Sequence, residues 1–145
     1  MKGLFYEDIE VGMEIPPLVK NPTTAQLVRW AGASGDFYEL HYDKDFAQRA
    51  GMPGVLVHGQ LKWQFLIQMI TDWIGVYGTI MKIDCRYTGM DFPGDTLTCN
   101  GRVVKKFFEK NLHCFECELF LENQRGEKTV SANAVVSVPL KEQDA

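Results

Sequence analysis

An aspartate and a histidine stand five positions apart in a segment rich in turn-forming residues. The segment covers residues 33–41 and reads ASGDFYELH. Because a loop of this length can fold back on itself, the carboxylate of Asp36 and the imidazole of His41 can face one point. Such a pair can hold one water molecule, since the carboxylate accepts a proton and the imidazole binds or relays one near neutral pH. In the alternative interpretation, Asp36 only caps a turn and His41 only packs.

A second candidate site lies just before the most apolar segment of the chain. Residues 51–59 read GMPGVLVHG and lead into this segment, with His58 and Gly59 at the junction. The first N–H groups of a helix have no intrahelical partner, and glycine lets a ligand approach the backbone closely. Such N–H groups can stabilise an enolate oxygen formed from a thioester. Alternatively, His58 is only the N-cap residue and Gly59 only fits a crowded position.

Capping and turn residues predict helices over 24–33, 44–50 and 59–74. The first begins at Thr23, which forms a capping box with Gln26, and it is expected to end near Gly35. Asp43 is the expected cap of the second helix. The third is apolar over most of its circumference, so it must be buried on most sides and wrapped by other elements.

The second half of the chain predicts the elements that wrap this helix. Apolar and polar residues alternate with a period of two in four segments, 81–88, 97–103, 115–122 and 129–138. Turn signals separate them, and a fifth strand is expected around residues 13–15. We expect the four segments to form an antiparallel meander with one apolar face. One long helix wrapped by a curved antiparallel sheet of about five strands is an α+β architecture, in a single domain over residues 1–145.

Composition narrows the classes of function. The chain has 145 residues, 46% hydrophobic and 23% charged, which are values typical of one globular domain. Its net charge of −4 argues against a nucleic-acid partner. No segment reaches the roughly 18 apolar residues of a spanning helix and residues 1–10 lack a secretory signal, so we expect no membrane contact and a cytoplasmic location. Cys114 and Cys117 form a C-x-x-C inside a strand-like segment, which favours reduced thiols over a redox or zinc site.

Taken together, the two loops resemble the fingerprint of the MaoC-like, (R)-specific enoyl-CoA hydratases (hydratase 2 type). That fingerprint runs small residue, Gly, Asp, any residue, Asn, Pro, aliphatic residue, His, five more residues and a small one. It is matched here by Ser34, Gly35, Asp36, Leu40, His41 and Ala47. Residues 57–59 (VHG) look like the start of the family's central helix, and residues 92–97 (FPGDTL) like its sheet turn. The resemblance covers about residues 5–140.

The resemblance implies the hot-dog fold and a hydro-lyase. The implied reaction is hydration of a trans-2-enoyl thioester to an (R)-3-hydroxyacyl thioester, or the reverse dehydration. Asp36 and His41 would be the catalytic pair that activates one water, and the Gly59 N–H would bind the thioester carbonyl. Coenzyme A or acyl carrier protein would carry the acyl group. No metal and no cofactor beyond the substrate's own coenzyme A are expected, because the thioester itself acidifies C2.

The chain departs from the fingerprint at two positions. Tyr38 replaces the usual Asn and Glu39 replaces the usual Pro. The Asn is expected to position the loop by hydrogen bonding; Tyr38 can do the same or reach into the acyl pocket, whereas Glu39 is interpreted as a surface acid. Tyr38, Val57, His58 and Trp63 form the candidate substrate-binding set. Trp63 is alternatively a core residue, because aromatic residues at helical spacing usually pack inside.

Two other functions fit the same residues. A hot-dog thioesterase would direct the activated water to the carbonyl, and a non-catalytic partner subunit or acyl-CoA-binding module would need no chemistry. The presence of both Asp36 and His41 argues against the second. One hot-dog unit leaves an open sheet edge, so we expect a homodimer or a dimer-based oligomer. Three basic residues are interpreted as solvated surface charges rather than contacts to coenzyme A phosphates, namely Arg29, Lys62 and Arg86.

Overall fold

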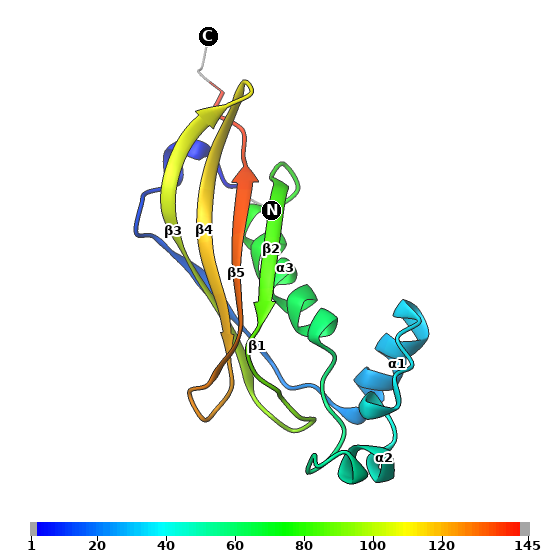
Figure 1. The fold of residues 1–145 in the computed structure, drawn as a ribbon. Helices are drawn as coiled ribbons and strands as arrows, with labels where there is room; N and C mark the ends of the chain where they lie inside the picture. Colours follow the sequence, from blue (N-terminus) through cyan, green and yellow to red (C-terminus); the bar gives the residue numbers. More distant parts are fainter. Residues whose placement is uncertain (1–2, 143–145) are drawn as a thin grey trace.

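A five-stranded antiparallel sheet curls around one long helix in the computed structural model, which describes residues 3–142 (Figure 1). The strands are β1 (Glu14–Lys20), β2 (Thr79–Tyr87), β3 (Leu97–Glu109), β4 (Leu112–Glu122) and β5 (Lys128–Ser137). The helices are α1 (Thr24–Ser34), α2 (Lys44–Arg49) and α3 (Gly59–Ile74), with 3-10 turns η1 (Tyr6–Asp8) and η2 (Glu39–His41). The predicted α+β class, central helix and sheet are confirmed; the predicted domain limits, 1 and 145, lie outside the described residues.

The hydrophobic core lies between α3 and the concave face of the sheet. Alternate residues of the central strands face the helix and are buried, including Cys99, Val103, Cys117, Leu119, Leu121, Val130, Ala132, Ala134 and Val136. From α3 they meet Leu61, Phe65, Leu66, Met69, Ile70 and Ile74. Burying this apolar area is what stabilises the wrapped arrangement.

The order of the strands corrects one prediction. The sheet runs β1-β3-β4-β5-β2, so β3, β4 and β5 form a meander but β2 pairs with β5, as in the Ile83 and Ala134 register. The expected four-strand meander is therefore wrong at the connection from β2 to β3, because these two strands are not neighbours in the sheet. Residues 88–96 run from β2 past the ends of β5 and β4 before they reach β3. A tight hairpin would keep β2 and β3 adjacent, whereas this connection is long enough to cross, and the alternation of residues does not specify which edge a strand joins.

Helices α1 and α2 lie beyond one end of the sheet, beside the start of α3 (Figure 1). The Thr23 hydroxyl accepts a hydrogen bond from Gln26 N at 3.2 Å, and the Asp43 carboxylate accepts one from Phe46 N at 2.9 Å. Gly35 ends α1 with φ at +78°, a left-handed conformation that glycine adopts without strain. The predicted caps Thr23 and Asp43 are present, but within residues 3–142 no bond from the Gln26 side chain completes the predicted capping box. The loop between α1 and α2 is bonded to the segment that precedes α3, through Leu40 and Leu56.

None of the described helices is long and apolar enough to cross a bilayer. The four cysteines are free, and Cys114 and Cys117 both lie within β4. Burial raises the pKa of the Cys99 and Cys117 thiols to about 12, so both are protonated at neutral pH. Neither group has the thiolate character that redox or metal chemistry requires.

Candidate active site

The loop that carries Asp36 is shaped by the end of α1. The Ser34 hydroxyl donates to Trp30 O at 2.7 Å and accepts from Asp36 N at 3.2 Å. The Asp36 carboxylate in turn accepts a long hydrogen bond from Tyr38 N, at 3.4 Å. These local bonds turn the chain back after Gly35 and hold the aspartate at the beginning of the loop.

His41 is oriented by the loop that precedes α3. Its Nδ1 lies 2.8 Å from Leu56 O, and Leu56 N donates to Leu40 O at 3.0 Å. A carbonyl oxygen only accepts hydrogen bonds, so the proton is on Nδ1. A neutral His41 therefore presents its Nε2 lone pair on the opposite side of the ring, where it can accept a proton.

The structure brings Asp36 and His41 together beside the N-terminus of α3. His41 Nε2 and Asp36 Oδ2 are 3.9 Å apart, and their side chains are 13% and 37% exposed. This distance exceeds that of a direct hydrogen bond, but a water oxygen placed to one side can bond both groups. The arrangement can thus hold one water between two proton-transferring groups that remain accessible from one side.

His58 links this pair to α3. Its ring stacks on the ring of His41, with centroids 3.9 Å apart and planes at 20°. Its Nε2 donates to Asp36 O at 3.3 Å, while Nδ1 is buried and has no partner among the described residues. His58 precedes α3 as the N-cap residue, but its side chain makes no capping bond. The sequence indicated the cap position and missed the side chain's hydrogen bond to the Asp36 loop.

Burial lowers the pKa of His58 below its ordinary value of 6.5, and the neighbouring His41 lowers it further. The unfolded chain therefore takes up a proton on this ring at a higher pH than the folded chain does. Stability is expected to be intact above pH 6.5 and to fall as the pH drops toward about 5.5. Urea unfolding of wild type and His58→Gln at about pH 7.5 and 5.5 measures this. The variant should lose less stability than wild type on acidification. An equal loss in both proteins would show that His58 is not the source of the pH dependence.

Gly59 is the first residue of α3, and its N–H has no hydrogen-bond partner within residues 3–142. A Cβ at this position would lie 3.1 Å from Cε1 of Tyr87. The crowded-position interpretation of Gly59 is therefore supported, because the Tyr87 ring occupies the space of a side chain. The unpaired N–H is present as well, so the two interpretations are compatible. Tyr87 was expected only as part of the strand over 81–88 and not at the site, since it lies on β2, far from Gly59 along the chain.

The other candidate substrate-binding residues are placed differently. Tyr38 is half-exposed, and its ring meets the His41 ring edge-on with centroids 6.0 Å apart. Val57 is a buried core residue, and Trp63 is partly buried on α3. Among residues 3–142, no hydrogen bond or ring contact joins the side chain of Val57 or Trp63 to that of Asp36 or His41. Glu39 is exposed, as predicted.

One prediction about charge is wrong. Arg29 and Arg86 are exposed, but Lys62 is only 2% exposed and pairs with Asp91 at 3.0 Å. The only sequence signal for this was a lone lysine on a helix face that is otherwise apolar. The partner Asp91 carries no local signal, because it lies in the crossover segment between β2 and β3.

One group of side chains among the described residues could hold a metal ion. It consists of Asp36, His41 and His58, whose ligand atoms all lie within 4.8 Å of one another. Metal ligands must aim their lone pairs at one point about 2 Å from each atom. The His41 and His58 rings are stacked nearly parallel, and His58 Nε2 is already bonded to Asp36 O. The geometry fits proton transfer better than metal ligation.

Comparison with known proteins gives the same family as the motifs. The MaoC like domain family matches residues 10–119. The peroxisomal enoyl-CoA hydratase 2 of Arabidopsis thaliana is 36% identical over 78 residues, which cover 52% of this chain and 24% of that protein. The chain thus spans only a small part of this relative.

Solved structures share the fold over nearly the whole chain. R-hydratase PhaJ1 from Pseudomonas aeruginosa superposes with a TM-score of 0.87 at 23% identity, covering 96% of this chain and 88% of that one. The ChsH1-ChsH2 complex from Mycobacterium tuberculosis gives a TM-score of 0.79 at 25% identity, covering 89% and 98%. The match over residues 10–119, the wrapped central helix and these superpositions together show that the chain belongs to the MaoC-like family and has its hot-dog fold.

Proposed function

We propose that the protein is a hydro-lyase that adds water to the 2,3 double bond of trans-2-enoyl thioesters, or removes it from (R)-3-hydroxyacyl thioesters. The single observation that carries the proposal is the 3.9 Å separation of His41 Nε2 and Asp36 Oδ2, with His41 Nδ1 fixed on Leu56 O. Membership of the MaoC-like family and the hydratase names of relatives support the same reaction class.

The proposed mechanism uses one water held between the pair. One group takes a proton from the water as its oxygen bonds to C3, and the other group delivers a proton to C2 on the same face. The electrons of the double bond move toward the thioester carbonyl, where the Gly59 N–H at the start of α3 stabilises the developing negative charge. Because the thioester acidifies C2, the proposed reaction needs no metal or further cofactor.

The experiment is a panel of trans-2-enoyl-CoA esters, followed by loss of the absorbance of the conjugated thioester. Saturated acyl-CoA esters in the presence of a thiol reagent form the second arm. Hydration without thiol release supports the proposal. Thiol release without hydration establishes the thioesterase alternative, and no reaction with any substrate in either arm supports the non-catalytic alternative.

Substrate choice belongs to the same proposal. Tyr38 lies edge-on against His41 and is half-exposed, so its ring can border the acyl group near the reacting carbons. His58 would shape the same wall through its stack on His41, whereas Val57 would act only indirectly, from the core, and Trp63 from its partly buried place on α3. The carrier, coenzyme A or acyl carrier protein, and a cytoplasmic location stay predictions.

We further propose a dimer in which β2 pairs with β2 of a second copy. The sheet has two edges, and β1 contains Pro16 and Pro17, which cannot donate to another strand. β2 has no proline, and Met81 on it is half-exposed. An open edge of this kind favours pairing with another strand. The ChsH1-ChsH2 structure is a complex of two different chains, so a pairing of this chain with a related one is the alternative.

Light scattering is expected to give the mass of a dimer for wild type and of a monomer for Met81→Lys. A lysine on the pairing strand would bring an added positive charge from each copy into the interface, where the charges repel each other and must lose water. The matched control is Val19→Lys on β1, which is equally exposed on the other edge and should leave the dimer intact. A monomeric wild type, or dissociation by the control alone, contradicts the β2 interface.

A further inference from the structure

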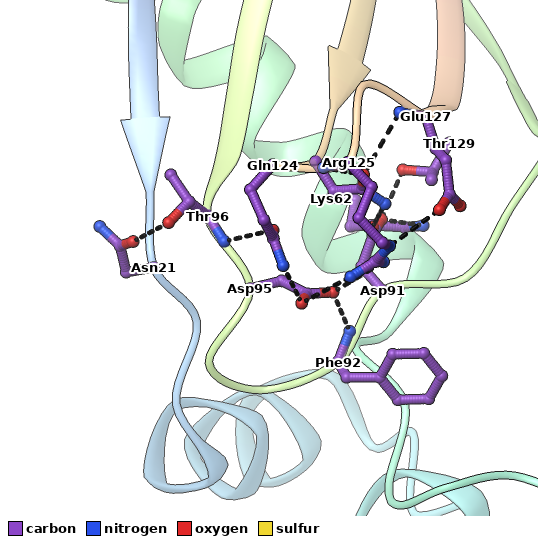
Figure 2. Close-up of polar contacts among 11 residues, drawn as sticks. Asn21, Lys62, Asp91, Phe92, Asp95, Thr96, Gln124, Arg125, Glu127 and Thr129 are labelled. Atoms are coloured by element: carbon purple, nitrogen blue, oxygen red, sulfur yellow. Dashed lines mark hydrogen bonds and ion pairs between the residues drawn. The ribbon is translucent and has the colours of Figure 1, made fainter.

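A buried ion pair outside the Asp36 and His41 group anchors the first turn of α3 (Figure 2). Lys62 Nζ donates to Asp91 Oδ2 and to Gly89 O, both at 3.0 Å. Lys62 is 2% exposed and Asp91 is fully buried. The pair joins the central helix to the crossover segment that leads from β2 to β3.

Asp91 is fully bonded by side chains from the sheet. The Thr129 hydroxyl, on β5, donates to the same Oδ2 atom that receives Lys62. Asn123, at the turn between β4 and β5, donates from Nδ2 to Asp91 Oδ1 at 3.0 Å. Both carboxylate oxygens are therefore satisfied, which is the condition under which a buried charge is tolerated.

The main chain of Asp91 holds α3 from a second direction. Its carbonyl oxygen accepts a hydrogen bond from Val57 N at 2.9 Å. Val57 stands two residues before Gly59 and Lys62 three residues after it. Asp91 therefore bonds the chain on both sides of Gly59. We call the contacts of Asp91 to Val57 and Lys62 the Asp91 clamp.

The crossover segment itself is held at its other end. Asp95 accepts hydrogen bonds from Gln124 Nε2 at 2.7 Å and from Arg125 at 3.2 Å, and from Phe92 N at 2.9 Å (Figure 2). The two carboxylates thus fix both ends of residues 91–95 against the turn between β4 and β5. Because residues 91–95 are themselves fixed, the Asp91 clamp can hold the start of α3 in one position.

Stability alone does not account for this pair. Moving two charges out of water costs several kcal/mol per ion, and apolar residues of similar volume are often as stabilising. What an ion pair with three further hydrogen-bond partners, Gly89, Asn123 and Thr129, adds is a defined geometry. The pair fixes the position of the N-terminus of α3. At this N-terminus His58 stacks on His41 and Gly59 presents its N–H.

We propose that Lys62 and Asp91 are positioning residues that set where His58 and the Gly59 N–H stand relative to Asp36 and His41. The kinetic consequence rests on the hydratase function proposed above. The structural consequence, a start of α3 held in one place, does not depend on any activity.

The kinetic test compares single variants with a neutral double variant. Lys62→Met and Asp91→Asn each leave one buried charge unpaired, so each should lower the thermal midpoint by about 10 °C or more. The double variant removes both charges, and its midpoint should return to within about 5 °C of wild type. Its kcat should nevertheless stay about 10-fold below wild type with KM changed less than about threefold, because misplacing the N–H affects the transition state most. A wild-type kcat in the double variant, or a change confined to KM, overturns the proposal.

The structural test is amide hydrogen exchange followed by NMR. The Val57 N–H is bonded to the main-chain Asp91 O, which the double variant keeps but no longer holds through the ion pair. Its exchange in the double variant should therefore be at least about 10-fold faster than in wild type. The Ile70 amide, further along α3, should be unchanged. If wild type hydrates no thioester while Val57 exchange accelerates, the proposed function fails and the clamp stands. If wild type is active and neither kcat nor Val57 exchange changes, the clamp fails and the function stands.

Three further variants separate the positioning effect from a loss of folding. Ile74→Ala makes a cavity at the far end of α3, so it should lower stability and leave kcat within about twofold of wild type below its midpoint. Should the double variant not fold, Thr129→Val and Thr129→Ser give the same comparison. The valine removes the donor to Asp91 and should lower kcat and speed Val57 exchange, whereas the serine keeps the hydroxyl and should restore both. Equal behaviour of the two overturns the proposal.

Discussion

Replacement of Asp36 by Asn or of His41 by Ala is expected to lower kcat for enoyl thioester hydration at least about 100-fold. Asparagine keeps the shape of the aspartate but cannot accept a proton. Alanine removes the Nε2 lone pair, together with the ring that bonds Leu56 O and stacks on His58. Initial rates of absorbance loss with the best enoyl-CoA of the panel measure both effects.

The two groups act on one water, so their effects should not add. The double variant Asp36→Asn/His41→Ala should be no slower than the slower single variant, within about threefold. Glu39→Gln is the matched control, because it neutralises an exposed carboxylate in the same loop. Its kcat should stay within about twofold of wild type, since surface substitutions away from a site change little. Single variants as active as wild type, in protein that is folded, contradict the role of the pair.

The second large effect is expected from Gly59→Ala, with kcat about 100-fold below wild type. The added methyl group would lie 3.1 Å from the Tyr87 ring and beside the unpaired N–H. Two effects of the methyl group can lower kcat: displacement of the Tyr87 ring, and obstruction of the thioester carbonyl that the N–H would bind. The thermal midpoint should change little, because Tyr87 is half-exposed and its ring can move outward.

Tyr87→Ala separates the two causes. In the double variant Gly59→Ala/Tyr87→Ala the methyl group has space, so any loss due to packing should be restored. We expect kcat to stay low in the double variant, within about threefold of Gly59→Ala, because the methyl still stands beside the N–H. Tyr87→Ala alone supplies the reference rate. Recovery of the double variant to that reference would show that Gly59 serves only packing, and would remove the N–H from the mechanism.

Much of this molecule follows from local patterns in the sequence. The helix over 59–74 was predicted with the bounds that it has, because a nearly continuous apolar surface and a preceding glycine-rich loop are local features. Thr23 and Asp43 cap helices where expected, since a cap bonds a backbone group three residues away. The length of the loop only allowed the approach of Asp36 to His41, beside the alternative that Asp36 caps a turn and His41 packs; the 3.9 Å separation of the two side chains decides between them.

The tertiary structure alone decided the contacts between segments that are far apart in the chain. Alternation predicted β2 but not its place beside β5, because a strand with one apolar face fits either edge of a sheet. The ring of Tyr87 over Gly59 follows from that place. Lys62 was expected in solvent because a lysine has no sequence signal for a partner in a distant loop, and only the path of residues 88–96 brings Asp91 to it. The sequence thus determined which groups can transfer protons, and the strand order decided what holds the N-terminus of α3 beside them.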